Sequence, residues 1–266
     1  MLYTIKYIFL NDVRGDFFLK PVIGITAGYK ADEKDITIKE KENRRKIYNF
    51  ITRDYANAIN KSGGIAVILP TPNSSEDTYS IMDKLDGVVL SGGNDINPVI
   101  CRQCADEFTG SLTCRRDDQE LDILDYVFKK RSIPVLGICR GTQIINAYFG
   151  GTLILNINSK IEHKQNKIPR YKAVHSVDIV EDSQLREIVK KKNIFVNSIH
   201  HQAIGNVGDG LKVSAKSSDN IIEAVESIDD NYNIIGVQWH PEIMYDIDEA
   251  CKNLFIDFVM NCKKFN

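Results

Sequence analysis

Short apolar runs that alternate with helix-like segments constrain the fold of this chain more than any other feature. Over the first 150 residues, the runs PVIGIT, IAVILP, DGVVLSGG and IPVLGI begin at residues 21, 65, 86 and 133. They are continuous rather than alternating, as in strands that are buried on both faces. The segments between them carry apolar residues at helical spacing. This order of elements favours a parallel sheet with helices on both faces.

Three helices are expected between these strands. The first lies within residues 39–64 and is closed by Gly63 and Gly64. Its apolar positions recur near helical spacing: Ile47, Phe50, Ile51, Ala58 and Ile59. The second is a short segment around residues 76–84. The third spans 115–132, with acidic residues early and basic residues late, an order that the helix dipole favours.

The second half of the chain favours strands. After residue 170 come the apolar segments AVHSVDIV, KVSAK, IIEAVE and IIGVQW, and a final helix is expected over roughly 246–262. The charged stretch 29–43 is predicted to be a long exposed loop. No Pro/Gly-rich linker and no internal repeat interrupts the sequence. We therefore expect one mixed-sheet domain over residues 21–266, preceded by an N-terminal extension over residues 1–20.

Charge and composition exclude several classes of function. The net charge of −2 and pI of about 6.2 predict no general affinity for nucleic acid or for anionic membranes. No stretch approaches the ~20 apolar residues of a membrane span. The first 20 residues lack the apolar core and cleavage site of a secretory signal. We therefore expect a cytoplasmic protein whose six cysteines are free thiols.

Three cysteines are close enough in sequence to raise the question of a metal site. Cys101 and Cys104 form the motif CRQC, and Cys114 follows. A structural zinc site uses four ligands, and no fourth ligand is apparent nearby. Unligated thiols are therefore the favoured interpretation, although the sequence leaves metal binding by this loop open.

The stretch GICRG places Cys139 where a predicted strand turns into a predicted helix. Its form, Gly-x-nucleophile-x-Gly, is that of a nucleophile elbow, in which the reactive residue occupies a tight and strained turn. The dipole at the start of the following helix favours the thiolate. The alternative is a packed cysteine at a glycine-rich junction between a strand and a helix.

A thiol nucleophile needs a base, and His240 is the best placed of the five histidines. It lies in GVQWHPE, directly after an apolar strand, and Glu242 is two residues further on. In extended chain, residues i and i+2 point to the same side, so the carboxylate can hold the imidazole in one tautomer. A lone His-Pro-Glu is typical of a surface turn. Together with the elbow, it favours a Cys–His–acid triad.

The two segments GICRGTQIINAYFGGTL and GVQWHPE resemble the class I glutamine amidotransferases, which attack a γ-glutamyl amide with a Cys–His–Glu triad. Further segments are similar to the γ-glutamyl-γ-aminobutyrate hydrolases, a peptidase C26-like branch of that superfamily: PVIGIT, YANAINKSGGIAVILP, LDGVVLSGGNDINP, RRDDQELDIL, VNSIHHQAI and SSDNIIEAVE. They cover about residues 21–260. The resemblance implies an α/β, flavodoxin-like three-layer sandwich with a mixed, mostly parallel sheet, in agreement with the pattern of strands and helices.

The resemblance also implies roles for individual residues. Cys139 would be the nucleophile, His240 the general base and acid, and Glu242 the carboxylate that orients it. The backbone N–H groups of Arg140 and Gly93 would form the oxyanion hole, with Gly92 permitting the turn. The glutamyl moiety would be contacted by four side chains: Gln143, His200, His201 and Gln202. His163 and His175 carry no motif, and no role is assigned to them.

Three classes of function agree with these features: a hydrolase of γ-glutamyl amides, a glutaminase subunit that delivers ammonia to a separate synthetase, and a non-catalytic relative. A non-catalytic relative would lack part of the triad, yet all three residues are present. GICRG and NSIHHQ favour the hydrolase, with a small γ-glutamyl compound as substrate. Because a thiolate is the nucleophile, neither a metal nor another cofactor is expected.

One segment departs from the family pattern. After NDINP the family usually carries a segment with proline and tyrosine, whereas this chain has VICRQCADEFTGSLTC at residues 99–114. This segment is predicted to lie near the mouth of the site. The glutamyl half of the substrate therefore follows from the resemblance, whereas the identity of the amine is left open. The sequence also leaves open whether the chain forms a homodimer.

Overall fold

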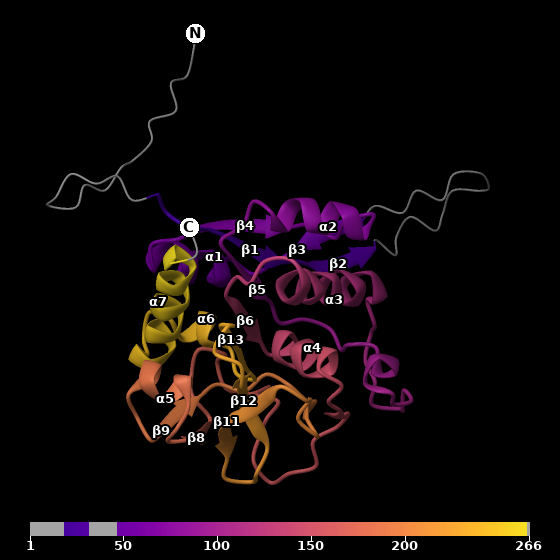
Figure 1. Cartoon of the computed structure of the whole chain (residues 1–266). Helices are drawn as coiled ribbons and strands as arrows, with labels where there is room; N and C mark the ends of the chain where they lie inside the picture. The colour runs from indigo at the N-terminus through magenta and orange to yellow at the C-terminus, as the bar shows by residue number, and fades with distance from the viewer. Residues whose placement is uncertain (1–18, 32–46, 265–266) are drawn as a thin grey trace, which may run out of the picture.

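The computed structural model of the chain describes residues 19–31 and 47–264 (Figure 1). The predicted N-terminal extension lies outside these residues except for Leu19 and Lys20. Its separation from one domain over residues 21–266 stays a prediction. Over the described residues, no helix combines the length and the apolar composition that crossing a membrane would require.

A central mixed sheet organises the fold. Its parallel part contains five strands in the spatial order β4, β1, β5, β6 and β13. Their bounds are Ile65–Leu69 for β4, Val22–Thr26 for β1, Gly87–Leu90 for β5, Val135–Ile138 for β6 and Ile234–Val237 for β13. The four strands predicted in the first half of the sequence are thus all present, and they are parallel to one another.

The antiparallel part continues the same sheet. Beyond β13 follow β12 (Ile222–Ser227), β11 (Leu211–Ser217), β8 (His175–Ile179) and β9 (Asn193–Val196), each antiparallel to its neighbour. Two short strands, β7 (Leu153–Ile154) and β10 (Ala203–Ile204), pair with each other, and β10 also pairs with β12. The predicted mixed, mostly parallel sheet of an α/β fold is therefore confirmed.

Helices cover both faces of the sheet and form the outer layers of the sandwich (Figure 1). One face packs against α1 (Arg53–Lys61), α5 (Gln184–Val189), α6 (Pro241–Met244) and α7 (Glu249–Lys264). The other packs against α2 (Ser75–Met82), α3 (Cys114–Lys129) and α4 (Arg140–Tyr148). Each face has its own core of fully buried side chains, including Ile59 and Phe255 on the first and Met82 and Ile123 on the second. The three-layer prediction is confirmed.

The helix predicted within residues 39–64 is wrong in its first part. It begins only at Arg53, and Ile47–Phe50 form strand β3, which is antiparallel to β2 (Gly28–Ala31). The run IYNFIT is rich in β-branched and aromatic residues, which favour extended chain. Most of the charged stretch 29–43 lies outside the described residues, but its start is part of β2 rather than a loop.

Strand β4 is less buried than its continuous apolar run predicts. It lies at the edge of the sheet, and Ile65, Val67 and Ile68 are exposed. The expectation that every strand in the first half is covered on both faces is therefore wrong for β4. The run of apolar residues indicates a strand, but the position of that strand in the sheet decides its burial.

Candidate active site

Cys139 lies between the end of β6 and the start of α4, in the geometry of a nucleophile elbow. Its backbone has φ 54° and ψ −106°, a strained conformation for a residue that has a Cβ. The N–H of Cys139 donates to the carbonyl of Val237 over 2.8 Å, which ties the turn to the adjacent strand. The side chain is almost completely buried. The predicted elbow is thus present in the structure.

The glycine after the nucleophile allows the helix to approach the sheet. A Cβ at Gly141 would overlap the carbonyl oxygen of Leu90, which ends the neighbouring strand β5. A larger residue would push α4 away from the sheet and move Cys139 with it. The flanking glycine of the motif is therefore required by the contact between backbones.

His240 and Glu242 lie together after strand β13. Nδ1 of His240 is 2.7 Å from Oε1 of Glu242, and the carboxylate is buried. Burial by itself would lower the pKa of His240, but Glu242 and Cys139 raise that pKa well above its usual range. A charged imidazolium in this position would stabilise a neighbouring thiolate.

The glycine turn after β5 lies next to His240 and Cys139. A Cβ built on Gly92 would lie 2.8 Å from Cε1 of His240 and 3.6 Å from Cβ of Cys139. The structure therefore brings the cysteine, the histidine and the glycine turn together around one small volume, as the sequence predicts. The catalytic roles of these residues stay predictions.

His240 and Glu242 are expected to contribute unequally to the rate of acylation. His240→Ala should slow acylation by about 10²–10⁴-fold, because it removes the group that transfers protons. Glu242→Gln should cost less, because the carboxylate only orients the ring and stabilises its charged form. Single-turnover acylation by a γ-glutamyl amide, with circular dichroism as a check of folding, measures both. A His240→Ala variant as fast as the wild type would remove His240 from the mechanism.

Tyr55, on α1, is a site residue that sequence analysis missed. Its hydroxyl accepts the N–H of Gly92 over 2.9 Å, which leaves the N–H groups of Gly93 and Arg140 as the proposed oxyanion donors. Burial, followed by the charge of Glu242, raises the pKa of Tyr55 well above its usual range, so the phenol stays neutral. The tyrosine begins the segment YANAINKSGG, but nothing in that segment indicates that it reaches the site.

Asn197 is a second residue that was missed. Its side-chain oxygen accepts the N–H of His240 over 2.9 Å, and its amide nitrogen donates to the carbonyl of His240 over 3.1 Å. The side chain is completely buried. Asn197 therefore holds the backbone of the proposed base from a segment 43 residues away in sequence.

A buried group of charged side chains holds the backbone of the glycine turn by hydrogen bonds. Arg116, on α3, donates to the carbonyls of Ser91 over 2.7 Å and of Gly92 over 3.1 Å. Its Nε also donates to Oε1 of Glu120 over 3.0 Å. Because Arg116 holds the carbonyls of this turn, it fixes the direction in which the turn presents its N–H groups.

The carboxylate of Glu120 also holds the segment of the second proposed oxyanion donor, Arg140. The guanidinium of Arg140 pairs with Glu120 and with Asp117, and all three side chains are buried. Burial would raise the pKa of Glu120, but the charges of Arg140 and Arg116 outweigh it, and the pKa is lowered. The backbone N–H of Arg140 is the predicted donor, whereas its side chain links the elbow to α3. Sequence analysis did not identify this role.

Of the four residues predicted to bind the glutamyl moiety, three converge. Nε2 of Gln143 donates to the carbonyl of Gln202 over 3.2 Å. Nε2 of Gln202 donates to Asp95 over 3.1 Å, and Nε2 of His201 lies 3.0 Å from the same carboxylate. Asp95 follows the glycine turn closely in sequence, so these contacts place Gln143, His201 and Gln202 near that turn. Their contact with substrate stays a prediction.

His200 has a different environment from its neighbour His201. It is buried, its Nδ1 lies 2.9 Å from the carbonyl of Gln202, and its Nε2 lies 3.0 Å from Oγ of Ser198. Burial lowers the pKa of His200 to about 4, so the ring is neutral. Both ring nitrogens are already used by protein groups, and a contact of His200 with substrate has no support in this geometry.

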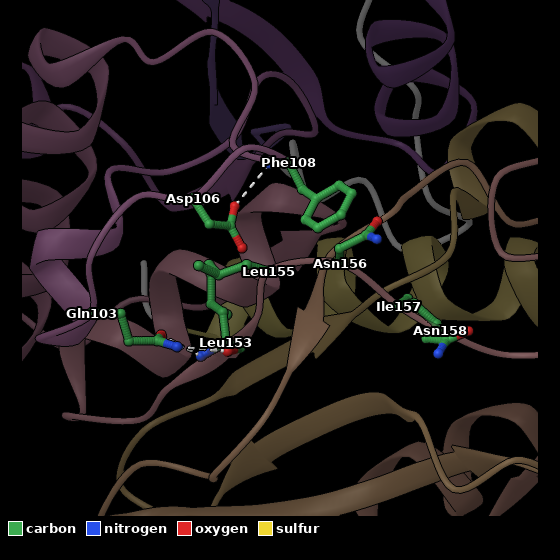
Figure 2. A pocket seen from close by; sticks show the side chains of 8 residues that line it. All are labelled: Gln103, Asp106, Phe108, Leu153, Leu155, Asn156, Ile157 and Asn158. Carbon is green, nitrogen blue, oxygen red and sulfur yellow. Dashed lines mark hydrogen bonds between the residues drawn. The ribbon is translucent and has the colours of Figure 1, made fainter.

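An open pocket of about 640 Å³ adjoins the segment around His201. Figure 2 shows its lining side chains, which come from the unusual segment 99–114 and from residues 153–158: Gln103, Asp106, Phe108, Leu153, Leu155, Asn156, Ile157 and Asn158. The N–H of Ile157 donates to the carbonyl of His201 over 2.8 Å. None of the triad residues lines this pocket, which is connected to the predicted substrate-binding residues through the backbone contact of Ile157 with His201.

Comparisons with known proteins identify the family of this chain. The family model of peptidase C26 matches residues 21–242. A candidate glutamine amidotransferase of Schizosaccharomyces pombe is 36% identical over 80% of this chain and 82% of its own length. The γ-glutamyl-γ-aminobutyrate hydrolase PuuD of Escherichia coli is 30% identical over 79% of this chain and 85% of its own length.

The fold is also found among solved structures. A candidate GMP synthase subunit from Thermoplasma acidophilum superimposes with a TM-score of 0.57. The alignment covers 92% of this chain and 96% of the other, at 19% sequence identity. At this identity the likeness shows the fold alone.

Proposed function

Because the chain belongs to the peptidase C26 family, we propose that it is a cysteine-dependent hydrolase of γ-glutamyl amide bonds. The observation that supports this most strongly is the strained turn at Cys139 beside a histidine whose Nδ1 is held by a buried carboxylate at 2.7 Å. A thiol, a base and an orienting acid are the parts that acyl transfer through a thioester needs. PuuD, at 30% identity, is named for γ-glutamyl-γ-aminobutyrate, so a compound of this kind is the leading substrate.

The proposed reaction has two steps. The Cys139 thiolate attacks the γ-carbonyl carbon, and the N–H groups of Gly93 and Arg140 stabilise the oxyanion. The imidazolium of His240 gives its proton to the departing amine, and a γ-glutamyl thioester remains on Cys139. His240 then takes a proton from water, which attacks the thioester and releases glutamate and the thiolate. One amide bond and one water molecule are consumed in each cycle.

The second candidate is a glutaminase subunit that supplies ammonia to a separate synthetase. It is favoured by the relative from S. pombe, which bears the name of a glutamine amidotransferase. Both candidates share the thioester chemistry at Cys139. They differ in the leaving group, and in whether the isolated chain is active.

The pocket next to the segment around His201 supports the hydrolase. It is lined by residues of segment 99–114, where this sequence departs from the family pattern. Ammonia would make no use of such a space, whereas a larger amine can gain binding energy there that is expressed in the transition state.

The isolated chain is expected to hydrolyse γ-glutamyl amides with a higher kcat/KM than glutamine. Values of kcat/KM should be measured for glutamine, for γ-glutamyl-γ-aminobutyrate, and for γ-glutamyl amides of neutral and cationic amines. If glutamine is the best substrate, or if every rate is negligible until a synthetase is added, the amidotransferase subunit replaces the hydrolase.

A variant of the pocket serves as the matched control for this panel. Phe108→Ala should raise KM for γ-glutamyl amides of larger amines and leave the values for glutamine unchanged, because ammonia, the leaving group of glutamine, is too small to contact Phe108 in this pocket. An equal change for glutamine and for the larger amides would show that the pocket does not receive the amine.

A further inference from the structure

A second group of ionisable side chains lies in the antiparallel half of the sheet, apart from the triad. Glu223, on β12, is completely buried, and His163, His175 and His200 surround it. Among the described residues, neither oxygen of Glu223 accepts a hydrogen bond, and Nε2 of His175 has no partner either. A buried carboxylate without hydrogen bonds is costly, so this arrangement needs a compensating group.

The distances in this cluster suit a shared metal ion better than direct hydrogen bonds. Oε1 of Glu223 lies 3.3 Å from Nδ1 of His163, 3.6 Å from Nε2 of His175 and 4.0 Å from Nε2 of His200. Zinc binds nitrogen and oxygen ligands at about 2.0–2.1 Å, which separates two ligands of a tetrahedral site by roughly 3.3–3.4 Å. The ligand atoms of His163, His175 and Glu223 all lie within 4.8 Å of one another.

The outer nitrogen of each histidine is held by an oxygen atom. Nε2 of His163 lies 3.0 Å from Oδ2 of Asp219, and Nδ1 of His200 lies 2.9 Å from the carbonyl of Gln202. Nδ1 of His175 lies 3.3 Å from the carbonyl of Ser176. Histidines that bind metal almost always donate their other N–H to a carboxylate or a carbonyl, which fixes the tautomer and turns the free nitrogen to the metal. His163 and His175 have this arrangement, whereas Nε2 of His200 lies 3.0 Å from the hydroxyl of Ser198.

We propose that His163, His175 and Glu223 bind a divalent metal ion, for which zinc is the best match. Two imidazoles, a carboxylate and a water molecule in the fourth position are a ligand set that zinc accepts. All three side chains are buried, so the ion would be shielded from bulk solvent. It would hold the segment at His163 to strands β8 and β12, and its role is separate from the thioester chemistry at Cys139.

Metal analysis of the native protein tests this proposal. The chain, purified without a histidine tag, is expected to contain about one zinc ion per molecule by mass spectrometry of the metal. A chelator should remove the ion and lower Tm, and zinc should restore Tm. Titration of the chelated protein with Co²⁺ should produce the visible absorption of a tetrahedral site. A protein that is purified without metal and binds neither zinc nor Co²⁺ would overturn the proposal. In that case a protonated His163 between Asp219 and Glu223 holds the cluster together.

Variants identify the ligands. His175→Gln and Glu223→Gln should each abolish the Co²⁺ spectrum, because each removes one ligand of a four-coordinate site. A double variant, Cys104→Ser with Cys114→Ser, is the matched control and should keep the spectrum, since these exposed thiols lie outside the cluster. Loss of metal in the cysteine variant, with retention in His175→Gln, would place the ion at the CRQC loop and reject this site. If a ligand variant does not fold, the titration of the wild-type chain still decides whether metal binds.

Discussion

Replacement of Cys139 by alanine is expected to abolish hydrolysis of γ-glutamyl amides and to leave the fold intact. The thiol supplies the only proposed nucleophile, and without it no thioester forms. Loss of a catalytic nucleophile of this kind lowers kcat by about 10⁴–10⁶-fold. Cys139→Ser should be nearly as inactive, because a hydroxyl is too poor a nucleophile for a site built around a thiolate. The measurement is turnover of a γ-glutamyl amide by each purified variant.

Folding of the Cys139 variants has to be measured beside their activity. Alanine keeps the Cβ and removes one sulfur atom from an almost completely buried position, so circular dichroism should match the wild type. Cys104→Ala, at an exposed thiol, is the matched control and should keep full activity. A folded Cys139→Ala variant with near-wild-type turnover would show that Cys139 is not the nucleophile.

Glu120→Ala is expected to destabilise the protein by about 3–5 kcal/mol, the usual cost of removing one partner from a buried group of charges. Glu120 pairs with Arg116 and Arg140, and all three side chains are buried. Without the carboxylate, two guanidiniums face each other with Asp117 as the remaining acidic partner of Arg140. Because these arginines hold the glycine turn and the elbow, turnover should fall as well.

Urea unfolding of the Glu120 variant measures the change in the free energy of unfolding. Asp118→Asn is the control, since it removes one negative charge from an exposed position on the same helix. It should change stability by less than about 0.5 kcal/mol. Equal stability of Glu120→Ala and Asp118→Asn would show that the buried charges contribute nothing net, and that other contacts hold the turn.

Local patterns were sufficient to predict most of the central sheet and the elbow. The strands β1, β5 and β6 are continuous apolar runs, and their burial follows from that composition. Strand β3 was mistaken for the start of a helix because four residues carry too little periodicity to separate the two structures. Its pairing with β2 joins segments about twenty residues apart, and no local signal reports such a contact.

The sequence by itself determined the family, the turn at Cys139 and the pairing of His240 with Glu242, because each depends on residues that are close together in the chain. Only the tertiary structure decided which distant side chains support them. Tyr55 meets Gly92 across 37 residues, Glu120 meets Arg140 across 20, and Asn197 meets His240 across 43. Likewise, no sequence motif surrounds His163 or His175, and only the tertiary structure shows that both lie next to Glu223. Hydrogen bonds and ion pairs act over a few ångströms in space, whereas sequence patterns record only neighbours along the chain.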